Sequence, residues 1–122
     1  MIIGIGLDLV ETNRIKALIE KTDKFPKRVL TKEEYDQYIN LSKHRQIEYI
    51  AGRFCAKEAA AKALGTGIGK ELSFQDITIM NDEKGRPMMH IEKLKDKTIH
   101  LSITHTKEYA AAQVIIEENE IF

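Results

Sequence analysis

The sequence has a single cysteine, no long apolar run and no excess of charge of either sign. Because Cys55 has no second thiol to pair with, an internal disulfide is excluded, and we expect a reduced, cytoplasmic setting. No apolar stretch approaches the roughly 20 residues that cross a bilayer. The N-terminus also lacks the basic start and small-residue cleavage site of a signal peptide. We therefore expect neither a membrane protein nor a secreted one.

The balance of positive and negative charge bears on which macromolecules the protein could bind. Lysine plus arginine and aspartate plus glutamate both total 19, so the formal net charge is zero. General nucleic-acid-binding proteins usually carry a basic excess, and we expect no nucleic-acid partner. A local basic patch that faces an acidic partner is still compatible with a neutral chain. At 122 residues the chain is long enough for one compact domain, expected over residues 1–122, and too short for two.

The first segment, residues 2–10, predicts a strand with two different faces. The large aliphatic residues at the odd positions point one way, and Gly4, Gly6 and Asp8 point the other. Two glycines beside an aspartate let another backbone or a ligand approach closely. We expect this face to meet either the rest of the fold or a bound molecule.

The remaining patterns predict an α+β fold in which helices pack on a largely antiparallel sheet. Residues 13–21 read as a short helix, and residues 23–28 are mixed and basic with no predicted element. A capping box at 31–34 opens a second helix that runs to about residue 40. A long third helix is expected over about 44–64, ended by Gly65. The expected order is one strand, these three helices, and then a run of strands over residues 76–80, 88–91, 98–106 and 109–116.

The long helix places charge among apolar residues. At 100° per residue, Glu58 and Lys62 lie on the stripe that begins with Ile47, Ala51 and Phe54. One interpretation is an ordinary i, i+4 surface pair between the two charges, which is the more common case. The other is that Glu58 faces a cation in a cleft and Lys62 faces an anion beside it. The apolar surroundings favour the second interpretation, because buried charges need partners.

Asp8 presents the same choice between a capped or exposed strand residue and a metal ligand. Two carboxylates from distant segments, Asp8 and Glu58, could share one cation with waters and phosphate oxygens. That arrangement suits Mg²⁺, which takes few protein ligands. It does not suit zinc, which favours histidine and cysteine.

Two other segments could contact phosphate. The glycine-rich stretch 65–70 does not fit the Walker A pattern, because only three residues separate Gly65 from Gly69 and Glu71 follows the lysine. It reads as a helix stop and connector, with close backbone contact to a ligand as the alternative. Residues 102–106 end a strand with hydroxyls and His105, which could bind phosphate or could be ordinary strand-end chemistry.

Taken together, several segments are similar to one family. They are residues 4–8, residues 53–59 with Lys62, and residues 102–106; residues 65–69 and 72–76 also match. In order and spacing the chain resembles the bacterial holo-[acyl-carrier-protein] synthases, the small type of 4′-phosphopantetheinyl transferase. Position 55, alanine in many members, is cysteine here, and we expect that side chain in the core.

The resemblance implies roles for individual residues. Asp8 and Glu58 match the family's magnesium ligands, and Lys62 matches the lysine near the coenzyme A pyrophosphate. These three would be the catalytic residues. Besides Lys62, the coenzyme A site would include Arg53, Gly65, Thr104 and His105. A basic surface for acidic carrier-protein helices would be formed by Arg14, Lys21, Lys24, Phe25 and Arg28.

The resemblance also implies a function. It is the Mg²⁺-dependent transfer of 4′-phosphopantetheine from coenzyme A to a serine of apo-acyl carrier protein, in fatty acid biosynthesis, with adenosine 3′,5′-bisphosphate as the second product. The family forms homotrimers with active sites between subunits. Glu58, Asp8 and free hydroxide all remain candidates for the base. The alternatives are another Mg²⁺-dependent nucleotide or phosphate transferase, and a non-enzymatic module whose basic helices bind an acidic partner.

Overall fold

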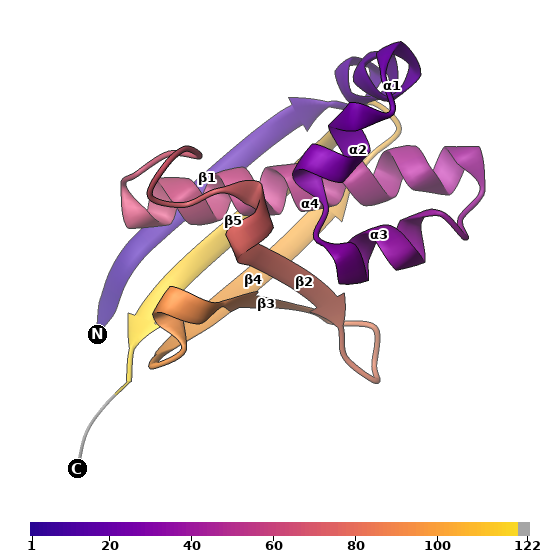
Figure 1. Cartoon of the computed structure of the whole chain (residues 1–122). Helices are drawn as coiled ribbons and strands as arrows, with labels where there is room; N and C mark the ends of the chain where they lie inside the picture. Colours follow the sequence, from indigo (N-terminus) through magenta and orange to yellow (C-terminus); the bar gives the residue numbers. More distant parts are fainter. Residues whose placement is uncertain (120–122) are drawn as a thin grey trace.

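The structure is a computed structural model, and it describes residues 1–119. The first half of the chain is one long strand followed by helices (Figure 1). Their bounds are β1 Ile2–Glu11, α1 Thr12–Lys21, α2 Lys24–Val29, α3 Lys32–Tyr38 and α4 Lys43–Leu64. The second half consists of short strands and single 3₁₀ turns. Their bounds are η1 Phe74–Asp76, β2 Ile77–Asn81, β3 Pro87–Ile91, η2 Glu92–Leu94, β4 Lys97–His105 and β5 Tyr109–Glu118.

The predicted α+β class is confirmed, and the structure adds one helix to the predicted three. The basic stretch for which we expected no element forms α2, with Pro26 inside its first turn. Proline is tolerated there because the first N–H groups of a helix have no intrahelical partner. The predicted boundaries of α3 and α4 hold to within a few residues. The Ser42 side chain accepts the Arg45 N–H, and Gly65 ends α4 with a φ of 76°.

The strands form two antiparallel sheets. One has the order β1-β5-β4, and the other is the β2–β3 hairpin. In the larger sheet Asp8 on β1 lies opposite Ala112 on β5, which lies opposite Ile103 on β4. Helix α4 crosses one face of this sheet. The shorter helices α1, α2 and α3 lie on the same side of the sheet, beside α4 (Figure 1). Within residues 1–119 no helix is long and apolar enough to cross a membrane.

The glycine face of β1 packs directly on α4. A Cβ atom at Gly6 would lie 1.7 Å from the carbonyl oxygen of Ala59, and one at Gly4 would lie 2.1 Å from that of Ala63. No other residue fits without moving the backbone, because real Cβ atoms do not approach so closely. The predicted close approach is therefore made by another backbone. It brings β1, and with it Asp8, against the C-terminal half of α4.

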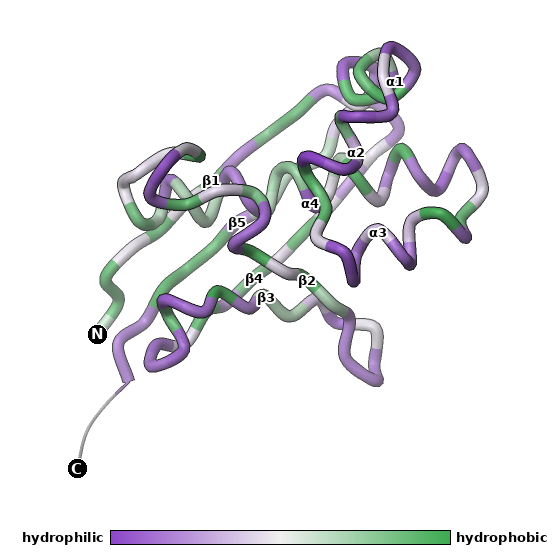
Figure 2. The backbone as a smooth tube through the Cα atoms, viewed as in Figure 1, coloured by the Kyte–Doolittle hydropathy of each residue, from purple (hydrophilic) through white to green (hydrophobic). Residues whose placement is uncertain are grey.

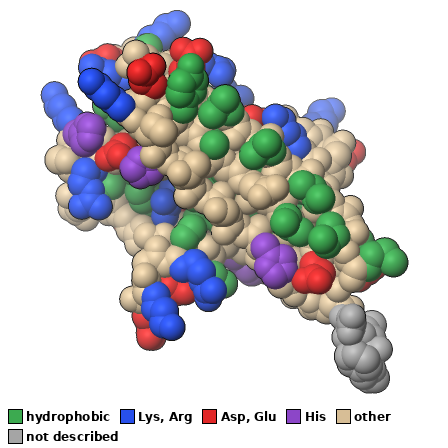
Figure 3. Space-filling model, turned by 180° about the vertical axis from the view of Figure 1, so that it is seen from behind, with side chains coloured by type: hydrophobic (Ala, Val, Ile, Leu, Met, Phe, Trp, Pro, Cys, Tyr) green, Lys and Arg blue, Asp and Glu red, His purple; other side chains and the backbone are tan. Residues whose placement is uncertain are grey.

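The apolar core lies between α4 and the two sheets, where the helix contributes mainly alanines (Figure 2). The opposite face of β1 is also apolar but uncovered: Ile3, Ile5, Leu7 and Leu9 are 46–62% exposed. Seen from behind, apolar side chains spread over this side of the molecule (Figure 3). A contiguous row of exposed aliphatic side chains on a strand indicates a surface that another chain covers.

Candidate functional site

The first cluster of site residues joins β1 to α4. The Lys62 ammonium donates hydrogen bonds to Asp8 Oδ1 at 3.1 Å and to the Leu7 carbonyl oxygen at 3.0 Å. The Asp8 side chain is 16% exposed and that of Lys62 is 54% exposed. The i, i+4 pairing of Glu58 with Lys62 is wrong as a description of this site, since Lys62 bonds to Asp8. The close packing of Gly4 and Gly6 on α4 makes that contact possible.

The electrostatics of this cluster centre on Glu58, which is half-buried. Burial raises the pKa of the Glu58 carboxyl, and the nearby charge of Asp8 raises it further. Lys62, Arg14 and Arg28 oppose that shift. The negative charge of Asp8 disfavours the ionisation of Glu58, and a cation beside both carboxylates would be stabilised. Lys62 supplies a positive charge at this place.

Cys55 lies behind the cluster and is fully buried, as predicted. Its thiol sulfur is 3.3 Å from the Ala110 carbonyl oxygen. Burial raises the pKa of the thiol to about 12, and the neighbouring Asp8 contributes in the same direction. The side chain is thus a protonated part of the core and not a nucleophile.

A cluster of aromatic rings and guanidinium groups lies around Phe54, one turn before Glu58 on α4. The Phe54 ring lies 6.1 Å from that of Phe25 and 5.7 Å from that of Phe74. Arg14 lies over the Phe54 ring at 5.9 Å, and Arg28 lies over the Phe74 ring at 6.0 Å. Of the residues predicted to bind a carrier protein, these two arginines and Phe25 therefore come close to Glu58. Lys21 and Lys24 are exposed at the end of α1 and the start of α2.

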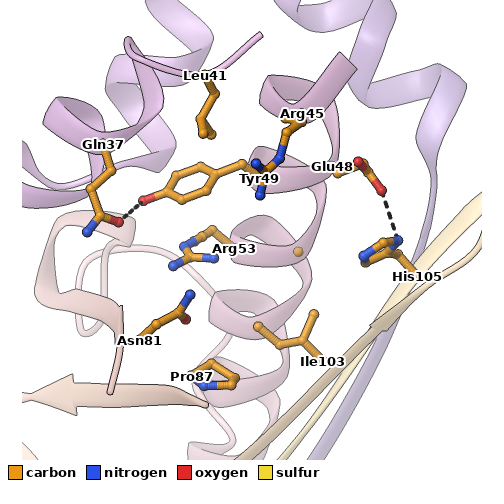
Figure 4. A pocket seen from close by; sticks show the side chains of 11 residues that line it. Gln37, Leu41, Arg45, Glu48, Tyr49, Arg53, Asn81, Pro87, Ile103 and His105 are labelled. Atoms are coloured by element: carbon orange, nitrogen blue, oxygen red, sulfur yellow. Dashed lines mark hydrogen bonds and ion pairs between the residues drawn. The ribbon is translucent and has the colours of Figure 1, made fainter. Parts of the chain in front are cut away.

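A second group of predicted site residues lines a cavity of about 590 Å³ (Figure 4). The cavity lies between α3, the N-terminal half of α4, the β2–β3 hairpin and the end of β4. It is lined by Gln37, Leu41, Arg45, Glu48, Tyr49, Gly52, Arg53, Asn81, Pro87, Ile103 and His105. The walls combine flat or apolar side chains with three basic ones. Such a pocket can hold a flat, apolar ring system that carries an anionic group.

Arg53 is the most constrained residue of this pocket. Its guanidinium lies 4.0 Å from the centroid of the Tyr49 ring and donates to the Ile79 carbonyl oxygen at 3.3 Å. The residue is only 7% exposed, and its Nε atom has no hydrogen-bond partner among the residues described. A buried N–H without a partner is costly, so this atom is a candidate donor to a ligand.

The other residues that we predicted for the coenzyme A site lie in different parts of the molecule. His105 lines the same pocket as Arg53, and its Nδ1 lies 3.1 Å from a Glu48 carboxylate oxygen (Figure 4). Thr104 instead lines a shallow hollow on the uncovered face of the larger sheet. Gly65 lies at the C-terminal end of α4. Neither Asp8, Glu58 nor Lys62 lines the pocket, because Glu58 points about 140° around α4 from Arg53.

A sequence profile of the 4′-phosphopantetheinyl transferase superfamily matches residues 4–114. The chain belongs to this superfamily. The profile covers all the residues that we expected to bind a metal, coenzyme A or a carrier protein. The predicted enzyme class, a phosphopantetheinyl transferase, is thereby confirmed.

Relatives in the superfamily confirm the resemblance to holo-[acyl-carrier-protein] synthases. The synthase of Bacillus velezensis is 58% identical over 117 residues, which cover 96% of this chain and 97% of the relative. That of Bacillus subtilis is 56% identical with the same coverage. The solved synthase from Bacillus anthracis is 48% identical with a TM-score of 0.91, covering 98% of this chain and 99% of that one. The one from Helicobacter pylori is 35% identical with a TM-score of 0.82, covering 93% and 99%.

Sequence reasoning predicted Arg53 but missed its neighbours Arg45 and Tyr49 in the pocket wall. Arg45, Tyr49 and Arg53 recur every four residues on α4, and this spacing could have identified the pocket wall. Phe54 was expected on the same stripe of the long helix as Glu58, but no sequence pattern indicated that its ring would meet that of Phe74. They are 20 residues apart in the sequence and meet only because the chain folds back.

Proposed function

We propose that the protein transfers 4′-phosphopantetheine from coenzyme A to a serine of apo-acyl carrier protein, with Mg²⁺ as cofactor. The products are holo-acyl carrier protein and adenosine 3′,5′-bisphosphate. The observation that carries the proposal is the cluster of Asp8, Glu58 and Lys62 in a member of the phosphopantetheinyl transferase superfamily. Two carboxylates and one lysine are the groups that a metal-assisted attack on a pyrophosphate requires.

Coenzyme A as the donor is supported by the solved relatives. The Bacillus anthracis synthase is a complex with CoA (3′,5′-ADP), and the Helicobacter pylori synthase is a complex with coenzyme A. The pocket around Arg53 and His105 has matching chemistry, since stacked and apolar walls suit an adenine ring and basic side chains suit phosphate.

The carboxylate cluster fits Mg²⁺ by its donor chemistry. It offers oxygen ligands only, and oxygen is the ligand atom that Mg²⁺ prefers. Within residues 1–119, no three histidine, cysteine or carboxylate side chains gather around one point. Asp8 and Glu58 would therefore hold the ion together with water and substrate oxygens. When bound, Mg²⁺ would neutralise charge on the pyrophosphate and help to hold it in line.

The side chains then have separate tasks in the transfer. The carrier serine Oγ attacks the β-phosphorus of coenzyme A, and a new Oγ–P bond replaces the bond to the α-phosphate oxygen. Adenosine 3′,5′-bisphosphate leaves, and Lys62, which is half-exposed, can donate to its departing phosphate. Glu58 is our candidate to accept the serine proton through a water molecule, because carboxylates are common general bases.

The carrier protein would bind across α1 and α2. Arg14, Lys21, Lys24 and Arg28 carry positive charge on these helices, and Phe25 adds an apolar contact beside Phe54. An acidic carrier helix would be steered there and held with its serine near Glu58. Because this surface is exposed, its contribution should weaken as salt is added.

We also propose a homotrimer with shared active sites. The carboxylate cluster and the nucleotide pocket of one chain lie on different sides of α4, an arrangement in which a second copy could complete each coenzyme A site. The exposed row of Ile3, Ile5, Leu7 and Leu9 on β1 offers an apolar surface for a second copy. On the family resemblance, we assign the reaction to fatty acid biosynthesis in the cytoplasm.

The decisive experiment is intact-mass analysis of an apo-acyl carrier protein incubated with this protein, coenzyme A and MgCl₂. We expect a mass gain of one phosphopantetheine that is absent when EDTA is added. No gain with several apo carrier proteins, from a folded sample, would refute the transfer and favour an interaction module. Consumption of coenzyme A without modification of the carrier would indicate a different phosphate transferase.

A further inference from the structure

The C-terminal end of α2 is held by side chains from distant segments. A helix leaves its last carbonyl groups without intrahelical partners. Here the Gln75 Nε2 amide lies 3.0 Å from the Lys27 carbonyl oxygen, 3.2 Å from that of Arg28 and 2.8 Å from that of Leu30. The Lys57 ammonium donates to the carbonyl oxygen between them, Val29 O, at 2.7 Å. Four consecutive carbonyls thus meet donors from η1 and α4.

This end of α2 carries part of the aromatic and guanidinium cluster around Phe54. Arg28 lies over the Phe74 ring, and Phe74 directly precedes Gln75 in the chain. The Phe74 ring in turn lies 5.7 Å from the Phe54 ring, and Phe54 lies one turn before Glu58 on α4. Gln75 therefore fixes the backbone of Arg28 and belongs to the same short segment as the ring under its guanidinium. A groove of about 440 Å³ that includes Arg28, Phe74 and Gln75 lies at this junction.

We propose that Gln75 is a positioning residue for the carrier protein. By bonding the end of α2 to η1, its amide sets where Arg28 stands relative to Glu58, and so where a docked carrier presents its serine. The inference rests on the proposed function, since it assumes that the carrier binds across α2. Gln75 itself touches no reacting atom.

The test is Gln75→Met, which keeps the length and neutrality of the side chain and removes its N–H donors. With α2 released, we expect the KM for apo-acyl carrier protein to rise at least about fivefold, the effect of losing one neutral hydrogen bond. The KM for coenzyme A should change less than about twofold, because the nucleotide pocket does not involve this junction.

A matched control is Gln46→Met. The Gln46 Nε2 amide donates to the Tyr38 carbonyl oxygen at 3.1 Å, at the end of α3. The same substitution there removes the same kind of bond from a helix that carries none of the proposed carrier-binding residues. We expect a comparable change in melting temperature and an unchanged KM for the carrier.

A second variant, Arg28→Gln, tests the proposed carrier-binding surface independently of the positioning role of Gln75. If Arg28→Gln raises the KM for the carrier and Gln75→Met does not, the positioning role is overturned and the surface stands. If neither variant changes it, both are overturned. An equal rise in the two KM values for Gln75→Met, or a rise in the carrier KM for Gln46→Met, would mean a general loss of structure and would also overturn the positioning role.

Discussion

Lys57 and Glu58 are neighbours in the chain, but they belong to two very different charged regions. Lys57 is fully buried and donates to Glu34 Oε1 at 2.6 Å, Val29 O at 2.7 Å and Phe74 O at 3.1 Å. All three of its N–H bonds are thus used within the fold. Glu58 is half-buried beside Asp8, and Lys62 bonds to that aspartate instead. The charge of Lys57 is saturated by hydrogen bonds within the protein, whereas the Glu58 carboxylate makes no side-chain hydrogen bond or ion pair within residues 1–119.

The partner of Lys57 is saturated in the same way. Glu34 Oε1 accepts the Thr31 N–H at 2.8 Å, which confirms the predicted capping box, and Oε2 accepts the Ile79 N–H at 2.7 Å. The pair therefore links α2, α3, α4, η1 and β2. Burial lowers the pKa of the Lys57 ammonium, and Glu34 opposes that shift. A charge with every bond filled stabilises a fold, whereas catalysis needs one that can still bind.

Removing the saturated charge should have the largest effect. Lys57→Met leaves Glu34 buried without its counter-ion, which costs about 3–5 kcal/mol when one partner of a buried pair is lost. We expect urea denaturation to show this loss in the free energy of unfolding. Lys57→Met combined with Glu34→Gln should recover part of it, because the orphaned charge is gone. A single variant as stable as the wild type would contradict the structural role of the pair.

Neutralising Glu58 should affect the reaction and leave the fold intact. We expect Glu58→Gln to lower the transfer rate about 10²- to 10⁴-fold, the range for loss of a general base. The loss of a metal ligand would act in the same direction. Mass spectrometry of the carrier protein measures the rate, and circular dichroism measures the melting temperature. Normal turnover at ordinary magnesium would exclude Glu58 as a ligand or base.

Replacing Lys62 should lower the rate of transfer less than replacing Glu58, and should lower stability less than replacing Lys57. Lys62→Gln removes the ammonium that bonds to Asp8 and that would meet the leaving phosphate. We expect kcat/KM to fall about 10²-fold, as for loss of one charge-stabilising donor. The free energy of unfolding should change by less than about 1 kcal/mol, because the ion pair is half-exposed. A large loss of stability with unchanged kcat/KM would assign Lys62 to the structural region.

The smallest effect concerns pH and stability. Because the pKa of Glu58 is raised in the folded protein, its ionisation is less favourable there than in the unfolded chain. Without metal, Glu58→Gln should therefore be more stable than the wild type at pH 7, by at most about 1 kcal/mol at this partly exposed site. The difference should close as the pH falls through the folded pKa toward the ordinary glutamate value. If the stability difference between the variant and the wild type grew as the pH fell, the pKa of Glu58 would not be raised in the folded protein.

Local patterns predicted most of the elements because their signals lie within a few residues of each other. The Thr31–Glu34 box, Ser42 and Gly65 each act on the nearest turn, and the alternation in β1 follows from its own geometry. Helix α2 was missed because it has six residues, includes Pro26 and buries only two side chains. Its stability comes from Gln75 and Lys57, which no local pattern could show.

The sequence alone determined the order of most elements, the two faces of β1 and the family, and the family resemblance led us to expect that Asp8 and Glu58 act together. Only the tertiary structure decided that Lys57 bonds to Glu34, that Lys62 bonds to Asp8, and that Gln75 holds the end of α2. These partners are 23, 54 and 45 residues apart, respectively, counting Gln75 to Leu30. The physical reason is that spacing specifies neighbours along one element. Which group pairs with a charged side chain depends on the backbone and side chains that tertiary packing places beside it.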